Sequence, residues 1–293
     1  SDVYKKLNQK PSVSQTDLRK QFRINDQIKA NFEIAKNILK PTQKQLEHGL
    51  ELHKNSLVID SYGFMPRAAY DGALINSAVN SKASSLEIQD MQEDMSMTRF
   101  VLDKKEREEF ENAWEASGVT CVIQNAGEEG NEVKRLLKRL AHFTYTTDMM
   151  SDFVRKAVTP DDIIRAKKEN RHALYFSGNG VPLPQDWISV EDELRYISIF
   201  FQLGIRMMHL TYNRRNVIGD GCAEKANGGL SDFGRAVVKE MNRVGVIVDI
   251  AHSGWQTSLE AAQLSERPMV ASHSTVASVN KHIRSKPDNV SGL

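Results

Sequence analysis

The sequence predicts an α/β fold of the (β/α)8 barrel type with an N-terminal helical extension, and three observations support this prediction. Six short apolar runs alternate with stretches of helical spacing, which is typical of a parallel sheet. The chain has 293 residues, of which 40% are hydrophobic, so it is long enough for one barrel. Residues 246–272 read as strand, helix and strand in succession, the repeating unit of such a barrel.

The predicted strands are short and are bounded by residues that interrupt regular structure. The fifth lies between Gly245 and Ser253 and has the continuous apolar character of a strand buried on both faces. The six runs cover residues 56–60, 118–125, 172–180, 204–212, 246–251 and 269–272. Because a closed barrel needs two more, we expect the last strands to be missing from this sequence.

Helical spacing predicts helices over residues 106–116, 131–150, 190–203, 231–244 and 257–265. A further helix opens at Pro160, with Thr159 as its N-cap. Residues 67–117 are expected to form a long, charged connection that contains only helical pieces. The polar residues 1–40 and the stretch 41–53 predict a peripheral helical arm. We therefore divide the chain into an N-terminal extension, 1–54, and a barrel domain, 55–293.

The bulk composition excludes several classes of partner. The formal net charge of +1 gives no reason to expect nucleic acid or a membrane surface as partner. No window approaches 18 continuous apolar residues, so no spanning helix is predicted. The two cysteines, Cys121 and Cys222, argue neither for a disulfide framework nor for a zinc ribbon.

Two histidines mark the predicted functional edge of the sheet. His252 follows the fifth strand and His273 follows the sixth, 21 residues later. Neighbouring parallel strands end at the same edge, and in α/β barrels that edge carries the chemistry. We therefore expect the two imidazoles to lie close together as metal ligands. His209 falls in the middle of the fourth predicted strand, so we interpret it as a core residue.

Three segments carry a family resemblance: GLSDFGRAVVKEMNRVGVIVDIAHSGWQT (229–257), SERPMVASHSTVAS (265–278) and RSKPDN (284–289). From about Ser56 to the C-terminus, and most specifically over residues 204–290, the sequence resembles the membrane (renal-type) dipeptidases, peptidase family M19. It implies an amidohydrolase-like barrel with hydrolase activity on a small peptide or amide. It also implies that His252 and His273 bind metal and that Arg284 holds the substrate carboxylate.

The chain departs from this family at several site positions, so we identify it as a divergent member. The family ends its first strand with two metal ligands and its third with a bridging glutamate. A substrate-facing histidine often follows the fourth strand. The residues standing there are Tyr62 and Phe64 for the first two ligands, Ser177 with Asn179 nearby for the glutamate, and Tyr212-Asn213 for the histidine. We expect Tyr62 and Phe64 to fill the vacated space, and Tyr212, Asn213 and Asn179 to contact substrate.

The resemblance and these departures leave two functions open. In the first, the chain is a metal-dependent hydrolase that holds at most one zinc ion. In the second, it is a metal-free pseudoenzyme that binds a ligand or acts in maturation. A small peptide-like partner, a homodimer and export to a periplasmic or extracellular location are expected by analogy with the family.

Overall fold

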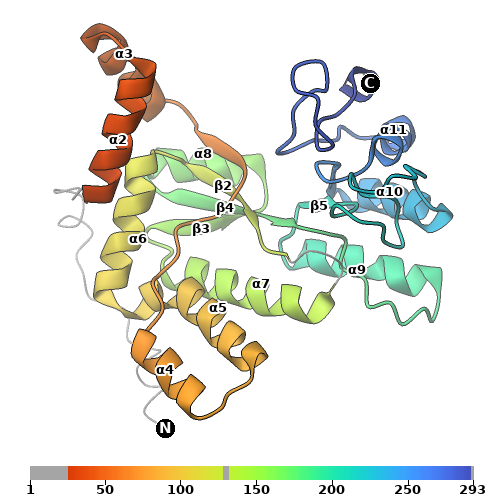
Figure 1. Cartoon of the computed structure of the whole chain (residues 1–293), viewed down its shortest axis with the longest axis horizontal. Coiled ribbons are helices and arrows are strands. Elements are labelled where there is room, and N and C mark those ends of the chain that lie inside the picture. The colour runs from red at the N-terminus through yellow and green to blue at the C-terminus, as the bar shows by residue number, and fades with distance from the viewer. Residues whose placement is uncertain (1–25, 128–131, 292–293) are drawn as a thin grey trace.

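The computed structural model describes residues 26–127 and 132–291, and in them the chain forms a parallel half-barrel (Figure 1). The strands are β1 Ile59–Gly63, β2 Cys121–Asn125, β3 Val154–Ala157, β4 His172–Gly178, β5 Met207–His209 and β6 Ile247–Asp249. They are ordered β1-β2-β4-β5-β6, and β3 pairs with β4. Every pair is parallel, as in a (β/α)8 barrel. The predicted fold class is confirmed.

The strands differ from the prediction in two places. β3 was not predicted, because its sequence VRKA places two cations in four residues. It pairs with the first half of β4, while β5 pairs with the last two residues of that strand. The predicted sixth strand contributes a single parallel bridge, between Val270 and Asp249. That bridge still brings the segment before His273 to the edge of β6.

The described residues contain eleven helices, and α7, α8 and α10 pack against the sheet (Figure 1). Their bounds are α2 Asp26–Leu39, α3 Gln43–Asn55, α4 Gly72–Asn80, α5 Ser85–Leu102, α6 Lys104–Ser117, α7 Val133–Met149, α8 Pro160–Lys168, α9 Val190–Gln202, α10 Asp232–Val244, α11 Trp255–Leu264 and α12 Asp288–Ser291. The region 67–117 is therefore mostly helical: the predicted helical piece 106–116 lies in α6, whereas α4 and α5 were not predicted. Ser84 and Glu87 form a capping box that starts α5 despite its polar sequence.

Helices α2 and α3 form the predicted arm, which projects from the sheet in Figure 1 and contains no buried residue. The first 25 residues of the predicted arm lie outside the described part of the chain. No helix in the described ranges combines the length and the apolar character that crossing a membrane requires.

The core lies between the sheet and its helices. Trp114 of α6 is buried against Phe110 and Phe153, and its indole Nε1 donates to the carbonyl of Val119 at 3.0 Å. On the sheet, Leu174 and Phe176 of β4 belong to the same buried cluster. This packing fixes the strands whose C-terminal ends carry the polar residues described below.

The cap of α8 offers a local test of these assignments. Thr159 accepts from the backbone of Asp162, whose carboxylate accepts from Thr159 in return. Replacing Thr159 by alanine should lower the free energy of unfolding by about 1 kcal/mol, because a backbone donor loses its partner. Urea denaturation measures this loss. The Ser151→Ala control, at an exposed turn position, should change it by less than about 0.5 kcal/mol.

Candidate functional site

Polar side chains from five segments meet at the C-terminal edge of the sheet. His209 ends β5 and Asp249 ends β6, while His252 and His273 lie in the segments that follow. The ring centroids of His209 lie 5.3 Å from those of His252 and His273. Tyr62 of β1 stacks on His273 with 4.2 Å between ring centroids. The edge that the sequence predicted to carry chemistry therefore gathers three imidazoles.

His252 and His273 meet as expected, with 2.9 Å between their Nε2 atoms. The other ring nitrogens are held by neighbours, since His252 Nδ1 lies 2.8 Å from Asn213 Oδ1 and His273 Nδ1 lies 2.8 Å from Ser272 Oγ. Burial, assisted by the positive charge of Arg284, lowers the pKa of His252 to about 3. Burial and the neighbouring His209 lower the pKa of His273 to about 4. Both imidazoles are therefore neutral near pH 7, the form that binds metal.

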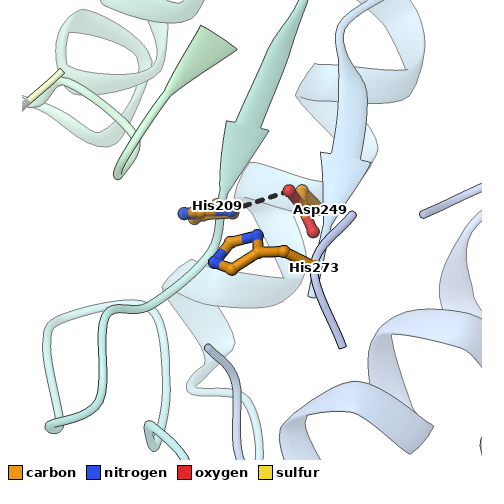
Figure 2. A group of neighbouring side chains, drawn as sticks. All are labelled: His209, Asp249 and His273. Carbon is orange, nitrogen blue, oxygen red and sulfur yellow. Dashed lines mark ion pairs between the residues drawn. The ribbon is translucent and has the colours of Figure 1, made fainter. Parts of the chain in front are cut away.

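His209 is buried, as expected, but it belongs to the site and not to the general core. Figure 2 shows its ring directed toward Asp249, with His273 beside both. The Nε2 atom lies 2.7 Å from Asp249 Oδ2, and both side chains have 0% exposure. The Nδ1 atom lies 2.9 Å from Asn179 Oδ1. Sequence reasoning missed this pair, because both residues lie inside the predicted apolar runs and not at their ends.

Asp249 organises the surrounding backbone as well as His209. Its Oδ1 atom accepts from the backbone N–H groups of Ala251 and Ser272 at 2.9 and 3.2 Å, and its Oδ2 atom accepts from the Ser272 hydroxyl. Burial alone would raise the pKa of Asp249, but His209 and these hydrogen bonds hold it below its usual value. The site therefore contains a buried carboxylate that stays ionised.

The residues at the family's metal-ligand positions differ in where their side chains lie. Tyr62 lies in the site, and its hydroxyl donates to Asn179 Oδ1 at 2.7 Å. Phe64, expected to fill the same space, is 56% exposed, with the Arg67 guanidinium 5.6 Å from its ring. The expectation for Phe64 is wrong, because β1 ends at Gly63 after a register irregularity, and Phe64 lies beyond the strand with its ring exposed. Ser177 is buried, and its hydroxyl donates to the carbonyl of Gln124.

The predicted substrate-binding residues line the same edge. The half-buried Arg284 donates from Nε to Ala251 O at 3.3 Å and from Nη2 to His273 O at 3.4 Å. Tyr212 stacks on His252, with centroids 4.0 Å apart. Asn213 orients His252 through the contact given above. These positions bring a cation and a flat aromatic surface next to the imidazoles.

Lys286 is a buried cation near the site that sequence reasoning did not single out. It is 2% exposed, and its Nζ atom donates to Ser253 O at 2.6 Å and to Ser258 Oγ at 3.1 Å. It thereby ties the C-terminal segment to the turn that carries His252. Burial lowers the pKa of Lys286 to about 8, although the nearby Cys222 and Asp249 act to raise it.

This shift predicts a pH dependence of stability. Between pH 8 and about 10.4, the unfolded chain keeps a proton on Lys286 that the folded chain has lost. The contribution of Lys286 to stability should therefore rise with pH across this window. Urea unfolding of wild type and of Lys286→Met should show the wild type gaining relative to the variant from pH 8 to pH 10. A constant difference would contradict the assignment.

Three of the described residues could together hold a metal ion. Two imidazoles and a carboxylate form a common ligand set for catalytic zinc, and His209, Asp249 and His273 each offer a ligand atom within 4.8 Å of the others. His209 Nε2 is buried, and its 2.7 Å contact with Asp249 Oδ2 lacks hydrogen-bond geometry among the described residues. The side chains of Tyr62, Phe64 and Ser177 supply no carboxylate that could be shared between two ions.

Comparisons with known proteins agree with this fold. An amidohydrolase from Pseudomonas aeruginosa superposes with a TM-score of 0.58 at 27% identity, covering 82% of this chain and 59% of that one. The probable dipeptidase PvdM from Pseudomonas aeruginosa gives a TM-score of 0.63 at 19% identity, covering 85% and 60%. Dipeptidase tcpJ from Claviceps purpurea is 31% identical over 145 residues, 49% of this chain. That match spans 33% of the length of tcpJ.

The parallel half-barrel with polar residues at its C-terminal edge places the chain among proteins with an amidohydrolase-like and dipeptidase-like fold. The model of the membrane dipeptidase family (peptidase family M19) matches residues 47–291. The chain belongs to this family, as the sequence resemblance indicated.

Proposed function

We propose that the chain is a dipeptidase-like hydrolase of a small peptide or amide that works with a single metal ion. The observation that carries the proposal is the group of neutral imidazoles at the sheet edge, with Arg284 beside them. Family membership supports the hydrolase class. The loss of the acidic and histidine ligands at Tyr62, Phe64 and Ser177 supports one ion in place of two.

Arg284 provides the recognition element in this proposal. Its planar guanidinium suits a terminal carboxylate, which it can hold with two parallel N–H groups. Tyr212, stacked on His252, offers an apolar wall beside that carboxylate. A metal ion at the histidines would polarise the scissile carbonyl and lower the pKa of water. Asn213 and Ser272 keep the imidazoles of His252 and His273 oriented toward the site.

A second candidate function is favoured by one observation. Tyr62 stacks on His273 and covers one of its faces, which reduces the space for a ligand there. The chain would then be a metal-free family member that binds a peptide-like ligand without cleaving it. The homodimer and the exported location remain expectations by analogy with the family.

The experiment that separates the two functions is a hydrolysis assay on a panel of dipeptides with the purified chain. The metal-dependent hydrolase should release free amino acids, lose this activity on dialysis against a chelator and regain it when Zn²⁺ is added. Mass spectrometry of the products measures the reaction. A folded chain that binds the dipeptides but leaves them intact with Zn²⁺ present supports the binding protein instead.

A further inference from the structure

We infer that the metal ion is held by His209 Nε2, Asp249 Oδ2 and His273 Nδ1, with His252 as the group that supports His273 from behind. The inference rests on the proposed function, because it names the ligands of the same site. It replaces the expected ligand pair, His252 and His273, by a set centred on two residues that the sequence did not assign to the site.

A chain of short contacts links the polar atoms of the cluster. Six contacts make up this chain: Asn213 Oδ1 to His252 Nδ1, His252 Nε2 to His273 Nε2, His273 Nδ1 to Ser272 Oγ, Ser272 Oγ to Asp249 Oδ2, Asp249 Oδ2 to His209 Nε2, and His209 Nδ1 to Asn179 Oδ1. Within it, His209, Asp249 and His273 each offer a ligand atom, and these atoms lie within 4.8 Å of one another. Ligand atoms that converge in this way are what a single bound cation requires.

The contact between His209 and Asp249 is fully buried. His209 Nδ1 faces Asn179 Oδ1, which also accepts from the Tyr62 hydroxyl. His209 Nε2 faces the carboxylate at 2.7 Å. Both side chains have 0% exposure, and this nitrogen makes no hydrogen bond of acceptable geometry within the described ranges. Two buried ligand atoms that converge in this way are the arrangement of metal ligands.

His252 selects which nitrogen of His273 is available. The proton of His252 lies on Nδ1, where it is donated to Asn213 Oδ1, so its Nε2 is an acceptor. His273 can then donate from Nε2 to His252 across 2.9 Å, which leaves the lone pair of His273 on Nδ1. That nitrogen lies on the Asp249 side of the ring, because Ser272 Oγ contacts both groups.

A cation at this point is compatible with the neighbouring contacts. With an ion bound by His209, Asp249 and His273, the Ser272 hydroxyl still donates to Asp249 and His252 still contacts His273 Nε2. An ion placed between the Nε2 atoms of His252 and His273 would leave His209 and Asp249 outside its ligand set. Two imidazoles and one carboxylate suit a divalent transition metal such as Zn²⁺.

The test measures Zn²⁺ binding to the full chain by elemental analysis and calorimetry after chelator treatment. Wild type should bind one Zn²⁺ per chain. His209→Asn and Asp249→Asn should each weaken binding by more than about 100-fold, because each removes a ligand. His252→Asn should weaken it by only about 10-fold, as for a residue that orients a ligand. The control His142→Asn, at a histidine that pairs with Asp94, should bind like wild type.

Near-UV circular dichroism confirms that each variant folds, and the visible spectrum of Co²⁺-loaded protein reports the ligand set independently. Wild-type affinity in folded His209→Asn and Asp249→Asn would overturn the inference, as would two ions per chain or none. One ion lost with His209 or Asp249 but without dipeptide hydrolysis would support the ligand set and contradict the proposed function. Dipeptide hydrolysis by a chain whose metal is lost only in the His252→Asn variant would support the proposed function and contradict the ligand set.

Discussion

Replacing Arg284 by methionine is expected to lower kcat/KM for dipeptide hydrolysis by about 100-fold. The guanidinium would hold the terminal carboxylate through charged hydrogen bonds, each of which contributes about 1.5–3 kcal/mol. Methionine keeps much of the side-chain volume, so the half-buried position stays filled. Steady-state kinetics with wild type and variant measure the loss.

The matched control for this prediction changes the substrate. A dipeptide amide lacks the terminal carboxylate, so wild type should cleave it poorly and Arg284→Met should have little further effect. Arg267→Met, at an exposed arginine, should leave both rates unchanged. An equal loss on the free dipeptide and the amide would show that Arg284 does not recognise the carboxylate.

Replacing Asp249 by alanine is expected to lower the free energy of unfolding by about 3–5 kcal/mol, since each buried donor left without an acceptor costs about 1–3 kcal/mol. The carboxylate is fully buried beside His209 and accepts from two backbone N–H groups and a hydroxyl. Alanine would leave these donors without a partner.

Urea denaturation in the presence of a chelator measures this effect without a contribution from metal. Asp186→Ala, at an exposed position in the same solution, should change stability by less than about 0.5 kcal/mol. Asp249→Asn keeps the side-chain volume, so its loss of stability should lie between those of Asp186→Ala and Asp249→Ala. A loss below about 1 kcal/mol in Asp249→Ala would mean that this carboxylate does not organise the site.

The sequence was sufficient to predict the parallel barrel-type sheet and the meeting of His252 with His273. Both follow from one property, since consecutive strand–helix–strand units place their strand ends at a common edge. Helix limits were predictable where a cap marks them, as at Thr159 and Ser231. In region 67–117 only the stretch 106–116 of α6 was predicted, and the charged sequence of α5 hides its apolar stripe.

The roles of His209 and Asp249 could not be predicted because the sequence does not show where these strands end. The apolar run 204–212 places His209 in its middle, whereas only Met207–His209 pair in the sheet. Asp249 lies inside the apolar run 246–251, although β6 ends there. A residue inside a strand and a residue at its last position differ by one hydrogen-bonded pair, which hydrophobicity does not encode.

The most direct test of a single-metal site is a crystal structure of the Zn²⁺-loaded chain with anomalous diffraction measured at the zinc absorption edge. The account predicts one anomalous peak, within bonding distance of His209, Asp249 and His273 and with His252 behind His273. Two peaks, a peak shared only by His252 and His273, or no peak would contradict it.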